Sequence, residues 1–114
     1  MVHPVDCENS ARIAELNDLL RQTFIGGRIM LTDGIASLSD DNREAIITEV
    51  RSFTDFNEDN DPYGEHDFAA LTVNGHRINW KIDYFDRAIK YGSKDPSDPK
   101  VTTRVLTIML ASEY

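Results

Sequence analysis

The sequence has a single cysteine, and no apolar run in it approaches the length of a membrane-spanning helix. Cys7 has no second cysteine with which to form an internal disulfide, so we expect a reducing compartment, the cytoplasm. Residues 1–10 carry acids and Pro4 where a signal peptide needs a basic and then an apolar stretch. We therefore expect a cytoplasmic protein with no membrane partner.

Basic residues are scarce in the middle of the chain. Residues 33–67 contain eleven acids and only two bases, Arg43 and Arg51, whereas the rest of the chain holds nine acids and ten bases. The net charge of −8 therefore sits in one segment, which would attract a basic partner or a cation. Direct binding of DNA or RNA is disfavoured. Acidic segments also keep proteins in solution without binding anything, and this interpretation stays open.

One amphipathic helix is predicted near the start of the single domain that 114 residues allow. Apolar side chains recur at spacings of three and four within residues 10–24, Asn9 or Ser10 can cap the helix, and Gly26-Gly27 ends it. We expect residues 1–9 to be flexible and residues 10–114 to form the domain. The apolar stripe consists of Ile13, Leu16, Leu20 and Phe24.

A short strand and a second helix follow. Residues 28–32 are mostly of β type and end at Asp33-Gly34, which predicts a strand and a turn. Ser39 then caps a helix that runs to about Phe53, with two acids in its first turn that complement the helix dipole. The apolar stripe of this helix consists of Ile46, Ile47, Val50 and Phe53.

The pair Asn74-Gly75 between two β-type runs predicts a tight hairpin. With a two-residue turn, Val73 is directly opposite His76 and Phe68 is opposite Lys81. Alternate residues then form one apolar face and one mixed, polar face. The apolar face is expected to hold Asp67, Ala69, Leu71, Val73, His76, Ile78, Trp80 and Ile82.

The polar face of this hairpin holds the candidates for catalysis. The register places His66 opposite Asp83, with Lys81 one pair along, and a carboxylate raises the pKa of a neighbouring imidazole, as a general acid or base requires. No activated nucleophile and no phosphate-binding glycine loop accompanies them, so we expect no cofactor. Opposite charges across a sheet also stabilise it by themselves, so a structural pair is the other interpretation.

The remaining segments are two connections and one apolar run. Residues 54–65 and 86–100 lack periodicity and are rich in turn-forming residues, which predicts loops. Residues 102–111 are strongly apolar, and their β-branched content favours a strand, with a buried helix as the alternative. The predicted fold is α+β in the order αβαβββ, an antiparallel sheet with two helices packed on one face.

Several longer motifs carry a resemblance to a known family. They are Phe24 to Arg28, Asn60 to Phe68, Trp80 to Tyr84, and Arg104 to Ala111 with the terminal Glu113-Tyr114. Over roughly residues 11–114 the sequence resembles the domain of unknown function numbered 3768, an uncharacterised bacterial family. The resemblance implies no mechanism. It implies small stand-alone proteins, mostly of alphaproteobacteria and often carried on plasmids or other mobile elements.

The acidic loop offers weak candidates for a metal site. Asp59, Asp61 and Glu65, with His66 and Asp67 beside them, supply ligands of the kind that hard cations take from irregular loops. The spacing does not match the calcium loop of EF hands, because Ala70 stands at the twelfth position where glutamate is required. A turn in which Asp and Asn side chains bond to their own backbone explains the same composition.

Two hypotheses about function follow. The first is a non-enzymatic binding protein whose acidic surface engages a basic protein; in the context that the resemblance implies, it inhibits or modulates a host nucleic-acid enzyme or defence complex. The second is a small hydrolase or metal-dependent enzyme that uses His66, Asp83 and the Asp59–Asp67 loop. The oligomeric state stays open. The acidic surface comprises Asp40, Asp41, Glu44, Asp55, Glu58, Asp59, Asp61, Glu65 and Asp67.

Overall fold

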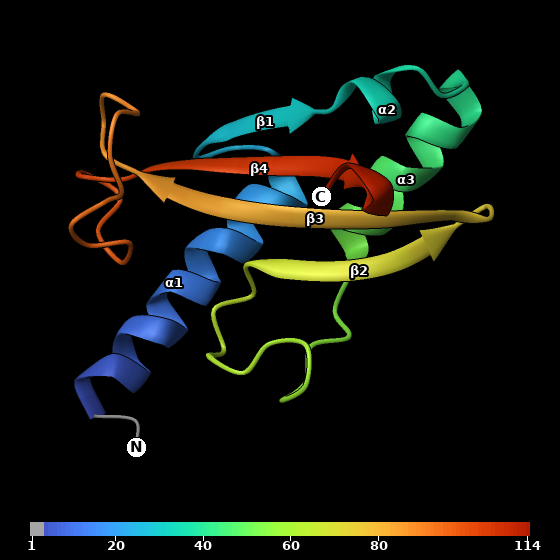
Figure 1. Ribbon diagram of the computed structural model, residues 1–114. Coiled ribbons are helices and arrows are strands. Elements are labelled where there is room, and N and C mark those ends of the chain that lie inside the picture. Colours follow the sequence, from blue (N-terminus) through green and yellow to red (C-terminus); the bar gives the residue numbers. More distant parts are fainter. Residues whose placement is uncertain (1–3) are drawn as a thin grey trace.

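Figure 1 shows a computed structural model of the chain, which describes residues 4–114, with side chains from residue 9 onward. Within these residues, no helix is both long and apolar enough to cross a membrane. Two long connections, residues 53–67 and 86–102, remain irregular, as predicted. The elements in chain order are α1 (Pro4–Thr23), β1 (Arg28–Leu31), α2 (Asp33–Ala36), α3 (Asp40–Ser52), β2 (Phe68–Val73), β3 (His76–Phe85), β4 (Thr103–Leu110) and the closing 3₁₀ turn η1 (Ala111–Glu113).

The four strands form one sheet in the order β1-β4-β3-β2, and α1 and α3 both lie against the same face of it (Figure 1). The α+β class is therefore confirmed. The expectation of a purely antiparallel sheet is wrong in one pairing, because β1 runs parallel to β4. Residues 32–102 separate β1 from β4, so no tight turn dictates their relative direction.

The hairpin is confirmed in the predicted register. Val73 lies opposite His76, and Phe68 lies opposite Lys81. Both turn residues have a positive φ, 49° at Asn74 and 82° at Gly75, as a tight two-residue turn requires. The expected alternation along β3 therefore holds, and Ile78, Trp80 and Ile82 are buried on the face that the helices cover.

The core lies between this face and the two helices. Trp80 has no exposed surface and is the largest fully buried side chain. Phe53 and Phe56 both meet its ring edge-on, each with 6.1 Å between ring centroids. Leu20 from α1 and Val50 from α3 are also completely buried and pack in the same cluster. One core therefore joins the sheet, both long helices and the start of the acidic connection.

The start of α1 corrects one prediction. The helix begins at Pro4, six residues before the expected start, so the cap predicted at Asn9 or Ser10 is wrong. Proline is well suited to the first turn of a helix, where its missing amide proton is not needed. The expected flexibility of the first nine residues stays a prediction, and residues 1–3 lie outside the described part.

The second predicted helix is confirmed at its start. Ser39 is the N-cap of α3, and its Oγ accepts the amide proton of Asn42 at 3.2 Å. The turn expected at Asp33-Gly34 forms the one-turn helix α2 instead. The capping chemistry was therefore readable in advance, whereas the extra helical turn was not.

The last apolar segment is a strand, as favoured over the buried helix. β4 pairs with β3 on one side and with β1 on the other, so both of its edges are used. The chain passes close to it at Gly27, where a Cβ would lie only 2.6 Å from the backbone oxygen of Arg104. Only glycine fits there, which gives a physical reason for part of the Phe24 to Arg28 motif.

Candidate functional site

The acidic segment divides into two groups of carboxylates. Asp61, Glu65 and Asp67 are partly buried, and we call them the inward acids. Asp40 is exposed and forms an ion pair with Arg43. Asp33, the first residue of α2, is exposed as well. The six remaining acids are also exposed to solvent, and we call them the outward acids. They are Asp41, Glu44 and Glu49 on α3, and Asp55, Glu58 and Asp59 in the connection that follows.

His66 contacts α1 instead of β3. Its Nδ1 lies 3.0 Å from the carboxylate of Asp18, and its Nε2 lies 3.6 Å from that of Asp61. Its ring stacks on Phe56 with 4.0 Å between centroids and an angle of 3° between the planes. The pairing predicted between His66 and Asp83 is therefore wrong. The reason is the positive φ of His66, 55°, which turns the residue out of the strand.

Asp83 and Lys81 pair with each other on the outer face of the sheet, away from the helices. The Nζ of Lys81 lies 2.8 Å from the Asp83 carboxylate, and the two side chains are 39% and 40% exposed. Exposed pairs of this kind contribute little to stability. The three candidates for catalysis therefore do not meet at one place.

A buried asparagine connects α1, the acidic loop and the sheet. Asn17 has no exposed surface. Its Nδ2 donates to the backbone oxygen of Glu65 and to the hydroxyl of Tyr84, both at 2.9 Å, and its Oδ1 accepts from Nε of Arg104 at 2.8 Å. The Tyr84 hydroxyl donates in turn to the Glu65 carboxylate at 2.8 Å. These bonds fix the end of the acidic loop to α1, β3 and β4.

Arg21, one turn further along α1, is also buried. Its guanidinium donates to the backbone oxygens of Val50 and Arg51 at 3.0 and 3.2 Å, and to the carboxylate of Asp18 at 3.0 Å. The guanidinium also lies over the ring of Trp80, 5.2 Å from its centroid. Burial lowers the pKa of Arg21, and Asp18 partly offsets this effect. Arg21 thus ties the C-terminal end of α3 to α1 and to the core.

The inward acids take part in the folding of the loop. Asp61 accepts the amide protons of Glu65 at 3.1 Å and of His66 at 3.2 Å. Burial raises the pKa of Asp67, and the charge of Glu65 raises it further. Burial likewise raises the pKa of Tyr84, and its hydrogen bond to Glu65 adds to the shift, so the hydroxyl stays a donor. These carboxylates are therefore poorly placed to meet a partner.

The weak metal candidates do not gather into a ligand set. Asp61 faces the backbone, Glu65 accepts from a tyrosine hydroxyl, and Asp59 is exposed. In the described part of the chain, no three His, Cys, Asp or Glu side chains are placed to hold an ion together. Asn57 organises this loop, because its Oδ1 accepts the amide protons of Asp59 and Asn60 at 2.8 and 3.1 Å.

The buried polar network carries a sequence signal that the predictions did not use. Two of its members, Asn17 and Arg21, are four residues apart and fall within the apolar stripe of the predicted helix. Polar side chains that interrupt such a stripe are usually hydrogen-bonded when buried. Arg104 interrupts the apolar run of the last strand in the same way. The residues missed are Asn17, Asp18, Arg21 and Arg104.

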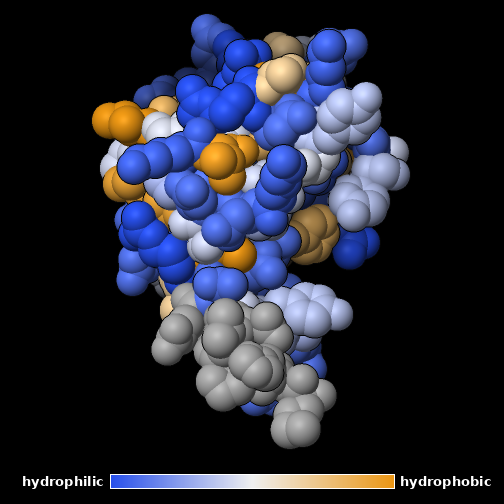
Figure 2. Space-filling model, turned by 90° about the vertical axis from the view of Figure 1, so that its left-hand side faces the viewer, coloured by the Kyte–Doolittle hydropathy of each residue, from blue (hydrophilic) through white to orange (hydrophobic). Residues whose placement is uncertain are grey.

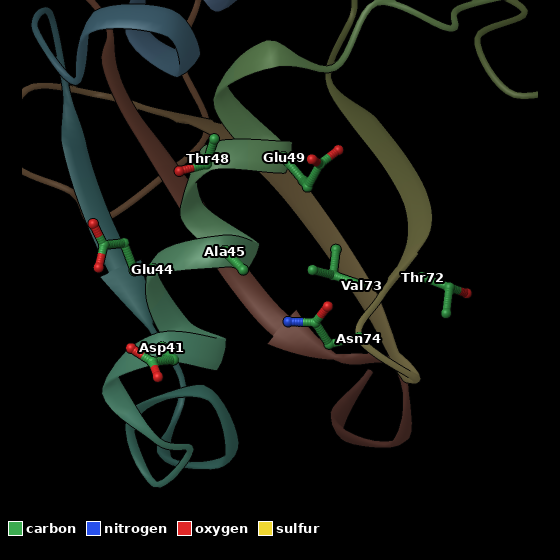
Figure 3. Close-up of a pocket in the computed structure, with 8 residues that line it drawn as sticks. All are labelled: Asp41, Glu44, Ala45, Thr48, Glu49, Thr72, Val73 and Asn74. Carbon is green, nitrogen blue, oxygen red and sulfur yellow. The ribbon is translucent and has the colours of Figure 1, made fainter.

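The outward acids of α3 line a groove beside β2, with a volume of about 620 Å³. Figure 3 shows Glu49 and Ala45 on the side of α3 that faces β2, with Val73 directed toward the helix. At the hairpin end, Nδ2 of Asn74 donates to Oδ1 of Asn42 at 3.1 Å and bridges the two walls. The groove carries three carboxylates, those of Asp41, Glu44 and Glu49, and no basic side chain.

The other end of the molecule carries the 86–102 connection. Figure 2 shows this end as largely hydrophilic, with small and separate apolar spots. Arg104 donates to the backbone oxygen of Pro96, and the Thr102 hydroxyl donates to that of Asp95 at 2.8 Å, so the connection is held to β4. No broad apolar surface marks the face seen in Figure 2 as a binding site.

The comparisons with known proteins agree with the resemblance in the sequence. The family model described as "Protein of unknown function (DUF3768)" matches residues 31–113, from the end of β1 to η1. The match leaves α1 outside, and with it Asn17, Asp18 and Arg21. No curated protein and no solved structure matches the chain. The chain belongs to the DUF3768 family of proteins of unknown function.

Proposed function

We propose that this protein is a non-enzymatic binding protein whose outward acids engage the basic surface of a partner protein. The observation that carries the proposal is a set of six exposed carboxylates that form no ion pair with any described residue. Among the described residues, Asp40 and Asp61 are the only acids of the 33–67 segment that form an ion pair. The field of the outward acids is therefore directed into solvent, where it attracts a basic partner.

The two arginines of the acidic segment support this proposal because they are occupied elsewhere. Arg43 donates to the backbone oxygens of Ala36 and Leu38 at 3.0 and 2.9 Å. Arg51 donates through Nε and a terminal nitrogen to the backbone oxygen of Gln22, at 3.0 and 2.8 Å. Both cations hold backbone segments together and leave the outward acids without compensation.

The form of partner that we favour is a host nucleic-acid enzyme or defence complex, which this protein inhibits or modulates. Such enzymes carry basic surfaces for phosphate groups, and a set of exposed carboxylates offers them charge of the same sign as phosphate. A mobile-element origin in alphaproteobacteria, as the family resemblance implies, fits this role. The cytoplasm is the natural site, because a lone cysteine stays reduced there.

The residues of the enzymatic alternative do not have the arrangement that catalysis would need. A general acid or base must reach a substrate proton through a free ring nitrogen. Both ring nitrogens of His66 face carboxylates, and one face of the ring is covered by Phe56. Asp83 is paired with Lys81 on the other face of the sheet. We therefore do not propose catalysis for this group of residues.

Salt dependence tests the proposed function. The tagged full chain is used to purify its partner from the native host, and the affinity of the purified pair is measured between about 0.05 M and about 0.5 M salt. We expect the affinity to fall steeply, because the attraction is screened over about 8 Å at physiological ionic strength. Replacing the outward acids by their amides should have a similar effect, and Glu15→Gln, an exposed acid on α1, is the matched control.

Two outcomes would contradict the proposal. One is an affinity that does not change with salt or with the amide replacements. The other is a partner that binds through nucleic acid, so that nuclease treatment releases it.

A further inference from the structure

β2 is an edge strand whose outer backbone groups are free for pairing. The amide of Ile82 donates to the backbone oxygen of Asp67 at 2.8 Å, and this bond sets the phase of the antiparallel ladder. The residues at odd positions of β2 therefore direct their N–H and C=O groups toward β3. Phe68, Ala70 and Thr72 direct theirs away from it. Ala70 and Thr72 are exposed, and no other described residue hydrogen-bonds to these outward groups.

β2 lacks the features by which edge strands are usually protected from pairing. The strand Phe68–Val73 contains no charged residue and no proline. The other edge strand, β1, has only four residues, begins with Arg28 and has α2 in contact with it. An open edge without charges or prolines is a template for an added strand.

The acidic groove runs along the helix side of this open edge. Thr72 and Val73 of β2 line it together with the α3 residues Glu44 and Glu49. In Figure 3, Val73 and Glu49 lie on the facing sides of β2 and α3, whereas Thr72 points away from α3. On the outer side of the sheet, Arg77 lies opposite Thr72. Positive side chains on an added strand would therefore be attracted to the groove and repelled from the outer side.

We infer that an extended, basic segment of the partner protein binds as an added strand on β2 and places its basic side chains in the α3 groove. The inference rests on the proposed function and names the form in which the partner binds. A second copy of this chain is a poor occupant, because pairing two β2 strands would bring two acidic grooves together. Nucleic acid is a poor occupant for the same reason of charge.

A designed peptide serves as the probe. It is a blocked peptide of about ten residues in which lysine alternates with valine or threonine, so that all its lysines share one side of a strand. Two derivatives carry N-methyl groups, one on every lysine and the other on every residue between the lysines. The protein is left unchanged, so its folding does not enter the comparison.

The two derivatives should behave differently, because only alternate amides of an added strand face β2. In antiparallel pairing the residues between the lysines face β2, and in parallel pairing the lysines do. We expect one derivative to lose at least about tenfold in affinity and the other to bind like the parent peptide. The identity of the weaker derivative gives the direction of pairing. Equal binding by both derivatives, or equal loss in both, would overturn the inference.

Substitutions in the protein locate the bound peptide. Glu49→Gln and Glu44→Gln should each weaken binding about threefold, whereas Glu15→Gln, an exposed acid on α1 outside the groove, should leave it unchanged. Ala70→Pro should abolish binding and keep the fold, because the amide that proline removes points away from β3. Self-association of the free chain that Ala70→Pro abolishes would assign the edge to a second copy and overturn the inference.

The outcomes also separate this inference from the proposed function. If the peptides bind in a salt-dependent manner but N-methylation has no selective effect, the acidic surface works by charge alone and the added strand is wrong. If neither the peptide nor the native partner responds to salt or to the loss of the acids, both proposals fail.

Discussion

The inward and outward acids are neighbours in sequence and carry the same charge, yet their surroundings are opposite. The inward acids accept hydrogen bonds from the backbone and from Tyr84, and burial raises the pKa of Asp67. The outward acids of α3 face solvent beside an open strand edge. A block of like charge in a sequence is thus no evidence for one surface with one role, because the neighbours of each carboxylate decide what it does.

Substitution of the buried Arg21 should have the largest effect on stability. Arg21→Met leaves the oxygens of Val50 and Arg51 and the carboxylate of Asp18 without their donor, and should lower the free energy of unfolding by about 3 kcal/mol. Urea denaturation measures this loss. Arg12→Met removes an exposed pair on the same helix and should change stability by less than about 0.5 kcal/mol. Equal stability of the two variants would show that buried and exposed charges contribute alike to the fold, contrary to this comparison.

Substitution of the buried Asn17 should have the second-largest effect on stability. Asn17→Ala removes the partner of the Glu65 backbone oxygen, the Tyr84 hydroxyl and Arg104, and should cost about 2 kcal/mol. Combining it with Tyr84→Phe should cost less than the sum of the two single changes, since the residues share one network. Strict additivity in this double-mutant cycle would show that the network is not coupled. Asn9→Ala, exposed on α1, is the control.

The raised pKa of Asp67 predicts how the stability of the protein depends on pH, which tests the comparison for one inward acid. Because the folded pKa of Asp67 is raised, its contribution favours the folded state at low pH and is lost as pH rises from its ordinary value of 3.8 through the raised value. Asp67→Asn should therefore raise the thermal midpoint at pH 7 and have a smaller effect near pH 4. A loss of stability at pH 7 would contradict the stated cause of the shift.

Glu113 supplies a control of the opposite sign for this experiment. Hydrogen bonds from Thr32 and from the amide of Leu110 lower the pKa of Glu113. Its contribution to stability is present above the ordinary value of 4.5 and is lost as pH falls through the lowered value. Glu113→Gln should therefore reduce the thermal midpoint at pH 7, and its pH trend should run opposite to that of Asp67→Asn.

The smallest effect on stability is expected for the outward acids. Glu44→Gln and Glu49→Gln should each change the free energy of unfolding by less than about 0.5 kcal/mol, because neither carboxylate has an ion-pair partner among the described residues. The same variants should weaken the complex with a basic partner. A large loss of stability would show that these acids support the fold, and the distinction between the two groups would disappear.

The elements were largely predictable because each has a local signal. Ser39 caps α3, and Asn74-Gly75 sets the hairpin register, through contacts within a few residues. The position of His66 was not predictable from the same register, because one residue with a positive φ ends the alternation. Its true neighbours, Asp18 and Phe56, are brought to it only by the packing of α1 and the acidic connection against the sheet.

The sequence by itself determined which segments form the two long helices and the four strands, the register of the hairpin, and the concentration of negative charge in one third of the chain. These depend on spacing and on local backbone chemistry, which act over a few residues. Only the tertiary structure decided the parallel pairing of β1 with β4, the burial of Asn17 and Arg21, and which acids face solvent. Those features depend on contacts between segments that are distant in the chain, and such contacts cannot be predicted from charge and periodicity.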